Sequence, residues 1–384
     1  MINASTPVAV LMPTQAEIQL FMQALSACGM KRVTTFTSTS EAYEVCIRQQ
    51  FPIFITRMEM PKMSGIVFIQ KLRMTGNYGL EPNMLVCDKV DNKIVNVMAE
   101  YDLEYVLAAP FTVTTASQKI RHMIDQENNL SSGEAQYREA KTAFSNGLVD
   151  MAQDFIEEVL RATPTLEKAL LLHGDMKASR EDFDGARELY KSALKSNPKS
   201  SSAAHKLAQL FTKQGDHRAA ADLLTKLAEI SPYSIRLLEN AGLSNFTAER
   251  YDDAKRIMGN LSGIDETNKT ASTVTADIKI KTGDYDDLVK TLSKSHDEKS
   301  IIQFLNNAGA KLSKGDDIDG AIRMYSAVLS QITDSKYLYA IHYNMGLAYK
   351  KKQDAANAKM HFKRALKFNA TFEKAIEELK KLSA

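Results

Sequence analysis

The stretch YNMGLAYKKKQDAANAKMHFKRALKFN, residues 343–369, decides the fold of most of this chain. Small and aromatic residues alternate along it at helical spacing: Gly346, Tyr349, Ala358, Phe362 and Ala365. Apolar residues recur every three or four positions on both sides of the polar segment 350–354. This is the pattern of two amphipathic helices joined by a tight turn, in which small residues let the helices approach closely.

The same pattern recurs upstream with a period of 34 residues. Its most regular members are Ala152, Ala186, Ala220 and Ala254; Pro164, Pro198 and Pro232; Gly174, Ala208 and Gly242; and, at twice the period, Gly147, Gly215 and Gly283. The third group is expected at the helix–helix contact and the last group in turns, where positive φ costs glycine little. The prolines are expected to follow the second helix of each pair.

This repeat resembles the tetratricopeptide repeat, which is a helix–turn–helix unit of 34 residues. The resemblance implies an all-α solenoid over residues 133–384, with about seven repeats that start near 133, 167, 201, 235, 269, 302 and 339. The repeat at 269–301 is the weakest, because Leu288 stands where alanine is expected, and small insertions or a kink are expected near 295–300 and 331–338. Residues 371–384 are expected to form a capping helix.

Residues 1–126 follow a different pattern, in which short apolar runs alternate with amphipathic segments. The apolar runs lie at 7–12, 33–38, 51–56, 84–87 and 105–109. Five buried strands, each followed by a helix, predict a flavodoxin-like, doubly wound parallel sheet of five strands. The polar residues 127–132 are expected to link this domain to the helical array.

The N-terminal domain resembles the receiver domain of response regulators. The matching motifs are Met60-Pro61-x-Met63-Ser64-Gly65 after the third strand and Ala109-Pro110-Phe111 after the fifth. The resemblance implies that the Ala109–Pro110 peptide bond is cis.

The residues that carry phosphotransfer in receivers are all replaced here. Arg57 stands at the position of the phosphoryl-accepting aspartate, and Met12 and Pro13 stand where an acidic pair would bind Mg²⁺. Cys87 replaces the hydroxyl residue and Ala109 the lysine. Since Mg²⁺ prefers oxygen ligands and a guanidinium repels it, the resemblance implies a pseudo-receiver without a metal or another cofactor.

Several alternatives stay open at this pocket. Arg57 either binds a carboxylate or anion of a partner, or fills the vacated pocket and donates to loop carbonyls. Glu59 and Asp88 are the nearest carboxylates in the sequence, and Glu59 is a possible replacement acceptor. Cys87 is either a redox sensor or a buried thiol at the end of a strand.

The first helix of each repeat is expected to line a concave groove that binds peptides or proteins. The candidate partner-binding residues are Arg236, Glu239, Asn240, Phe246, Asn306, Asn307, Tyr343, Asn344 and Lys351. The amides of Asn240, Asn307 and Asn344 stand two residues before a small residue of the repeat and are suited to bind a peptide backbone. Asparagine is also common at this position in the family, so the alternative is a purely structural role.

Composition excludes several classes of protein. A formal charge of +2 gives no basis for nucleic-acid binding. No apolar run is long enough to insert into a membrane, and the N-terminus lacks the features of a signal peptide. Three cysteines and seven histidines without metal-ligand spacing predict a cytoplasmic protein without disulfides or a metal site.

These observations favour a non-enzymatic bacterial signalling adaptor or scaffold. In this interpretation the receiver-like module docks a signalling protein independently of phosphorylation, and the repeats bind protein partners. One alternative is a phosphorelay response regulator that uses a non-standard acceptor and has the repeats as its output. A second alternative is a repeat-type phosphatase that acts on phosphorylated receivers.

Overall fold

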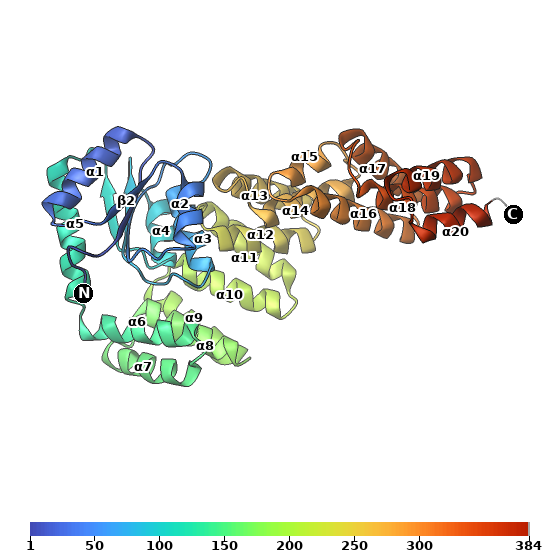
Figure 1. Cartoon of the computed structure of the whole chain (residues 1–384). Helices are drawn as coiled ribbons and strands as arrows, with labels where there is room; N and C mark the ends of the chain where they lie inside the picture. Colours follow the sequence, from blue (N-terminus) through green and yellow to red (C-terminus); the bar gives the residue numbers. More distant parts are fainter. Residues whose placement is uncertain (383–384) are drawn as a thin grey trace. The chain divides into compact units, whose positions relative to one another are not determined.

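Five short strands pair in parallel at the start of the chain (Figure 1), of which the computed structural model describes residues 1–382. The strands are β1 (Val8–Leu11), β2 (Val33–Phe36), β3 (Ile53–Arg57), β4 (Asn83–Cys87) and β5 (Tyr105–Ala108). Their order in the sheet is β2-β1-β3-β4-β5. This order confirms the predicted flavodoxin-like, doubly wound sheet. Five buried strands were expected, but β2 is an edge strand on which Thr34 and Thr35 are exposed.

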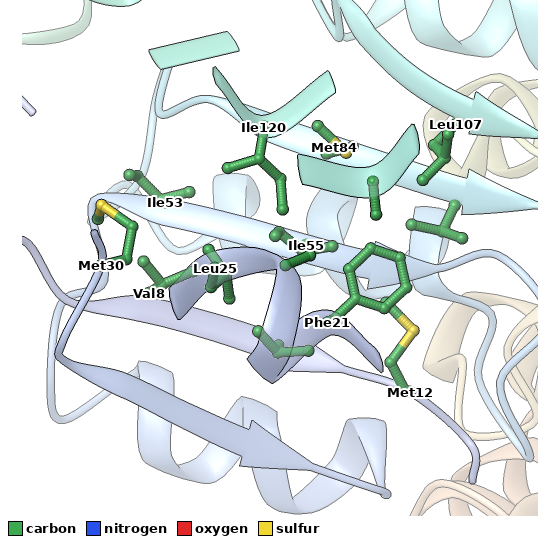
Figure 2. Packing of buried hydrophobic residues seen from close by; sticks show 14 of the residues in the cluster. Val8, Met12, Phe21, Leu25, Met30, Ile53, Ile55, Met84, Leu107 and Ile120 are labelled. Atoms are coloured by element: carbon green, nitrogen blue, oxygen red, sulfur yellow. The ribbon is translucent and has the colours of Figure 1, made fainter. Parts of the chain in front are cut away.

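Helices follow every strand and cover both faces of the sheet. They are α1 (Gln15–Ala27), α2 (Thr39–Cys46), α3 (Gly65–Met74), α4 (Asn92–Glu100) and α5 (Val113–Asn128). Helices α1 and α5 pack together on one face, where alternate strand residues such as Val8 and Ile55 contact Phe21, Leu25 and Ile120 (Figure 2). The Ala109–Pro110 peptide bond is cis, as expected.

The segment between the sheet domain and the helical array is shorter than expected. Helix α5 continues to Asn128, beyond the expected boundary at 126, and α6 already begins at Ser132. The last turn of α5 is held in place because the Asn128 side chain accepts from Ile2 N at 2.7 Å and donates to Ile2 O at 3.0 Å.

Paired helices make up the rest of the chain and confirm the predicted all-α repeat array. In the first compact unit, Met1–Glu266, they are α6 (Ser132–Ser145), α7 (Val149–Ala162), α8 (Glu167–Ser179), α9 (Phe183–Ser196), α10 (Ser201–Lys213), α11 (His217–Ile230), α12 (Ile235–Thr247) and α13 (Tyr251–Ile264). In the second unit, which begins at Thr267, they are α14 (Lys269–Thr282), α15 (Leu288–Ser293), α16 (Glu298–Lys314), α17 (Ile318–Gln331), α18 (Leu338–Lys351), α19 (Ala355–Phe368) and α20 (Glu373–Lys381).

Glycines in the first helices form notches that side chains of the second helices fill. A Cβ atom on Gly174 would lie 2.3 Å from the Tyr190 ring, and one on Gly346 would lie 2.6 Å from the Phe362 ring. Such distances are too short for any residue but glycine, so the small residues are required by packing. The turn glycines Gly147, Gly215 and Gly283 all have positive φ, as expected.

The array departs from the expected boundaries at three places. Helix α15 of the weakest repeat has only 6 residues. Helix α16 begins at Glu298, ahead of residue 302, because Asp297 accepts from Ser300 N and caps an additional turn. The expected capping helix 371–384 is α20, which begins later, at Glu373, and ends at Lys381. Residues 383–384 of the expected helix lie outside the described residues.

Candidate functional site

The predicted pocket residues meet at the carboxyl ends of the strands. The register pairs Leu11 with Thr56 and Arg57 with Val86, so that Met12 and Cys87 both lie next to Arg57. The Ala109 backbone N–H donates to Cys87 O at 2.9 Å. Pro13 is half-buried at the start of the loop into α1. The edge where these strands end is the usual position of functional sites in such sheets.

Arg57 is only 7% exposed, and three carboxylates surround its guanidinium. Its Nη2 donates to Asp88 Oδ1. Its Nε lies 3.0 Å from Glu59 Oε2 and 3.7 Å from Glu17 Oε1. Opposite charges make the burial of this guanidinium tolerable, and the pocket contains a cation supplied by the chain itself.

Two further contacts fix Arg57 in this position. Its guanidinium carbon lies 5.8 Å from the centre of the Phe111 ring, within the range of a cation–π interaction. A Cβ atom on Gly65 would lie 2.0 Å from Arg57 O, so glycine is required where α3 packs on the end of β3. The hydrogen bond of the guanidinium goes to a carboxylate, which corrects the expectation of loop carbonyls.

Sequence reasoning did not assign Glu17 to this pocket. Glu17 lies in the first turn of α1, where Thr14 Oγ1 accepts from Glu17 N at 3.2 Å. The position of Glu17 could have predicted its place in the pocket, because the first turn of the helix that follows β1 lies above the carboxyl edge of the sheet.

Cys87 and Met12 offer no reactive or ligating group to this pocket. Both side chains are fully buried, and Met12 packs in the hydrophobic core shown in Figure 2. Burial, together with the charge of Glu59, raises the pKa of the Cys87 thiol. Because the thiolate is the reactive form, this environment disfavours a redox role.

In the first unit, the first helices of the pairs face the sheet domain. Glu100, at the end of α4, accepts a hydrogen bond from Ser234 Oγ at 2.6 Å and lies 3.5 Å from His205 Nδ1. Asn240 Nδ2 lies 2.9 Å from the other ring nitrogen of His205. The two contacts of Glu100 join residues that are more than a hundred positions apart in the sequence.

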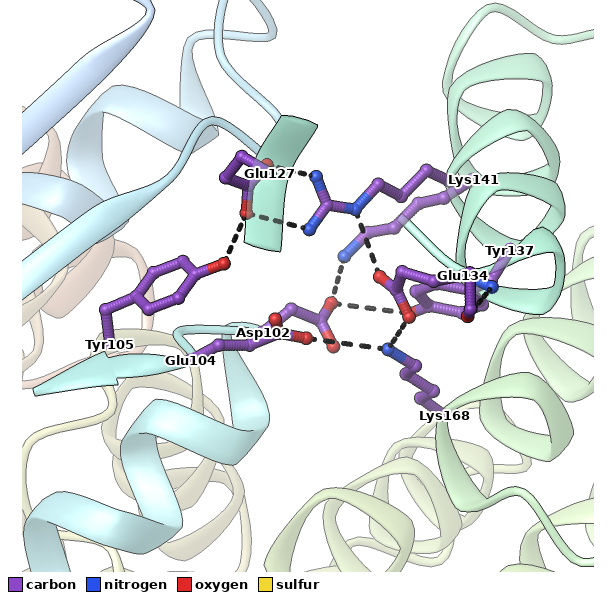
Figure 3. Close-up of polar contacts among 10 residues, drawn as sticks. Asp102, Glu104, Tyr105, Glu127, Glu134, Tyr137, Lys141 and Lys168 are labelled. Carbon is purple, nitrogen blue, oxygen red and sulfur yellow. Dashed lines mark hydrogen bonds and ion pairs between the residues drawn. The ribbon is translucent and has the colours of Figure 1, made fainter. Parts of the chain in front are cut away.

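A group of charged residues continues this contact toward α6 and α8 (Figure 3). Lys141 donates to Asp102, while Arg138 donates to both carboxylate oxygens of Glu127 at 2.6 and 3.1 Å. The Tyr105 hydroxyl donates to Glu127 at 2.8 Å. Burial lowers the pKa of Arg138, but the hydrogen bonds to Glu127 and a neighbouring glutamate outweigh it and raise the pKa above its ordinary value.

Helix α3 contributes a third group of contacts to the same face. The fully buried Gln70 donates to Tyr233 O at 2.7 Å and accepts from Ile235 N at 2.8 Å. The second bond satisfies a backbone donor at the N-terminus of α12. Lys71 pairs at 2.8 Å with Asp265, which is fully buried at the end of α13.

Comparison with known families identifies the helical part. Models described as tetratricopeptide repeat match residues 171–235 and residues 339–372. These helix pairs are tetratricopeptide repeats. Among solved structures, a tetratricopeptide repeat protein from Parabacteroides merdae is 17% identical with a TM-score of 0.41, and the match covers 66% of this chain and 99% of that one.

The N-terminal part has relatives of another kind. A Rhizobium etli protein named probable chemotaxis protein CheY is 29% identical over 94 residues, which cover 24% of this chain and 73% of that protein. The N-terminal domain is receiver-like. The solved structure of Vibrio cholerae chemotaxis protein CheY4 is 20% identical with a TM-score of 0.29, and the match covers 31% of this chain and 99% of that one.

The predicted groove residues of the first unit lie on α12, where most of them contact neighbouring side chains. Asn240 is held by His205, and Arg236 lies close enough to the Tyr101 hydroxyl to affect its pKa. The receiver-like domain thus reaches the repeat face beside the exposed Arg236, while Asn240 contacts a neighbouring repeat, and partner binding by these two residues stays a prediction. Glu239 is half-buried on the same helix, and Phe246 packs on the ring of Tyr251 at 5.8 Å.

In the second unit, the predicted groove residues make separate contacts. Asn344 Nδ2 donates to Asn306 Oδ1 at 2.8 Å, so these two amides bind each other. Tyr343 packs at 5.1 Å against the Phe372 ring, Lys351 pairs with Asp316 at 3.0 Å, and Asn307 is exposed.

No group of three or more His, Cys, Asp or Glu side chains in residues 1–382 is arranged to hold a metal ion. Over the same residues, no helix has the length and apolar character needed to cross a membrane. A receiver-like domain joined to tetratricopeptide repeats is a combination suited to signalling through protein–protein interactions.

Proposed function

We propose that this protein is a non-enzymatic, cytoplasmic signalling scaffold whose receiver-like domain acts independently of phosphorylation. The observation that carries the proposal is the buried Arg57 among Glu17, Glu59 and Asp88. A phosphoryl acceptor at this position would have to be a carboxylate, and a guanidinium cannot form the acyl phosphate.

The pocket residues do not fit the Mg²⁺ ion that the receiver resemblance implies. Mg²⁺ requires several oxygen ligands around a free central position. Here the guanidinium of Arg57 lies among the three carboxylates and repels a divalent cation. The local charge that a metal would neutralise is already neutralised in part by the chain itself, and no step of the proposed function uses a metal.

The repeats supply the second half of the proposal, which is binding of protein partners. Tetratricopeptide repeats present side chains of their first helices to peptides and proteins. The relative from Rhizobium etli is named a probable chemotaxis protein, which supports a role in signalling. In the second unit, the exposed Asn307 and the half-buried Tyr343 are the residues we expect to contact a partner.

The test is incubation of the full chain with acetyl phosphate and Mg²⁺, followed by intact mass spectrometry. We expect no added phosphoryl group and no shift of the melting temperature by Mg²⁺. The variant Arg57→Asp serves as a matched control, because it introduces a carboxylate at the acceptor position.

A base-labile phosphoryl group on the unaltered chain would contradict the proposal. Its loss in Glu59→Gln or Asp88→Asn would then identify the replacement acceptor and would support the phosphorelay alternative.

A further inference from the structure

A short segment of the receiver-like domain lies in the groove of the first four repeats. It is Glu100–Glu104, with the sequence EYDLE, and it joins α4 to β5. Three of its five residues are acidic, and one large aromatic residue stands among them. The repeats that surround it belong to the same compact unit, Met1–Glu266.

Each acidic residue of this segment has polar or basic partners on the repeats. Glu100 accepts from Ser234. Asp102 accepts from Lys141 and, at 3.4 Å, from the Tyr137 hydroxyl.

The third acidic residue has the weakest contact. Glu104 lies 3.6 Å from Lys168 Nζ, and Lys168 also binds Glu134 of α6 (Figure 3). The groove therefore matches an acidic segment at both of its ends, with the charged groups mostly on α6 and α8.

The aromatic residue is the centre of the contact. Tyr101 is 8% exposed, and its hydroxyl lies beside Ser234 and Arg236. Burial, together with the charge of Glu100, raises the pKa of this hydroxyl. A buried tyrosine with a polar tip, surrounded by ion pairs, is the usual anchor of a protein–protein contact.

The character of the contact indicates that the segment is exchangeable. Beside the buried Tyr101 and Leu103, its contacts are ion pairs and single hydrogen bonds, as in interfaces between domains of one chain. Asp102 also has a φ of 48, a left-handed conformation that costs about 1 kcal/mol for a residue other than glycine. A helix end from another protein offers the same set of acidic and aromatic groups.

We propose that the groove of repeats α6–α13 recognises an acidic helix end with a central tyrosine, and that Glu100–Glu104 occupies it as an internal ligand. A protein partner that carries such a helix end displaces the segment. This inference rests on the proposed function, because it names the class of partner that the scaffold binds.

The test uses the full chain and a labelled synthetic peptide with the sequence of residues 92–105, which covers α4 and the segment. The loosened variant Asp102→Asn with Glu104→Gln removes two charges while asparagine still tolerates the left-handed conformation. We expect this variant to bind the peptide at least about tenfold more tightly than the unaltered chain. The reason is that the state in which residues 100–104 have left the groove, and in which the groove is free to bind the peptide, is more populated.

Two controls define where the peptide binds. A peptide with the same three acids changed to amides is expected to bind at least tenfold more weakly. Addition of Lys141→Gln and Lys168→Gln to the loosened variant is expected to weaken binding about tenfold. Hydrogen exchange should be faster at amides 100–104 of the loosened variant and unchanged in α1 and α19. If Asp102→Asn with Glu104→Gln does not fold, the single substitution Glu104→Gln, at an exposed position, is used in its place.

Equal affinity of the unaltered and loosened chains, or no binding to either, overturns the inference. So does binding that is equally tight after the loss of both lysines, or exchange at 100–104 that does not change. Failure of the proposed function is seen separately, because phosphoryl transfer to the chain is measured by mass and does not depend on the peptide.

Discussion

The two units of this chain differ in the polar groups that they bury, although each also pairs a buried carboxylate with lysine. The first unit surrounds buried charge with charge of opposite sign, as at Arg57 and at the Arg138–Glu127 pair. The second unit buries a neutral pair, because His342 Nδ1 lies 3.1 Å from His361 Nδ1, and it holds a second neutral pair, Asn306 and Asn344, half-buried.

The difference determines which change disturbs each unit. A buried charge that loses its partner costs several kcal/mol, and weaker pairs near the surface respond to salt. A buried neutral imidazole costs little until it takes up a proton. We therefore expect the first unit to be sensitive to loss of charge and salt, and the second unit to be sensitive to acid.

The largest effect is expected at Arg57. The substitution Arg57→Leu removes the hydrogen bond to Asp88 and the cation–π contact with Phe111, and it leaves three solvent-accessible carboxylates without their cation. It should lower the free energy of unfolding of the first unit by about 2–4 kcal/mol. Urea unfolding measures this loss of stability, and hydrogen exchange of the β3 amides measures it locally. Arg48→Leu removes an exposed pair with Glu44 and should cost less than about 1 kcal/mol.

A background of Glu59→Gln and Asp88→Asn sharpens this test. There the same Arg57→Leu substitution should cost far less, because fewer charges stay unpaired. Equal costs in both backgrounds would mean that the carboxylates do not stabilise Arg57.

The second effect is the response of the second unit to acid. Burial lowers the pKa of His342 and His361 to about 4, with the charge of the other imidazole contributing at His342. The unfolded state therefore binds protons more tightly than the folded state. The contribution of the two neutral imidazoles to the stability of the second unit is fully present above the ordinary pKa of 6.5, and it is lost as the pH decreases toward 4. The loss is at most about 3 kcal/mol for each imidazole.

Hydrogen exchange in α18 and α19 between pH 7 and pH 4 measures this response. His342→Phe with His361→Leu should flatten it, whereas His122→Phe, at an exposed position of α5, should leave it unchanged. A second unit that stays equally stable down to pH 4 would contradict the neutral-pair description.

The third effect should be the same in both units, because both use the glycine notch. Gly174→Ala and Gly346→Ala place a methyl group against Tyr190 and Phe362 and should each destabilise by about 1–3 kcal/mol. Gly259 in α13 has open space at its Cβ position, so Gly259→Ala should stabilise by about 0.5–1 kcal/mol. Thermal unfolding of the three variants compares them, and a destabilising Gly259→Ala would contradict the packing argument.

The smallest effect concerns the half-buried ion pairs of the groove. Lys141→Gln should destabilise docking of the receiver-like domain by less than about 1 kcal/mol at low salt. The difference from the unaltered chain should disappear at roughly 1 M salt, where charges are screened. Exchange rates of amides 100–104 measure it, and an effect that is equally large in high salt would indicate a loss of packing instead.

The periodic features of this protein are predictable from its sequence for a physical reason. A helix pair that stacks on its neighbours must place a small residue at each contact, so Gly174 and Gly346 are visible as members of a 34-residue series. Buried parallel strands must be apolar on both faces, which identifies the sheet. The positions Met12, Arg57 and Cys87 follow from the ends of these strands.

The contacts between the receiver-like domain and the repeats have no such signal. Glu100 and Ser234 meet across 134 positions, and neither belongs to a series that constrains the other. The role of Glu17 was missed for the same reason, because one charge in a helix start serves equally well as a cap. Pairings of this kind depend on the tertiary arrangement, which local patterns do not encode.

Only residues 129–131 separate α5 from α6, and this short joint has a kinetic consequence. Three extended residues span about 10 Å, so a receiver-like domain that dissociated from the repeats would remain tethered close to the surface it had left. Rebinding would be intramolecular, with an effective concentration in the millimolar range. A partner would therefore have to be abundant, or attach at a second point, to keep the domain away, and the chain would reset soon after the partner dissociates.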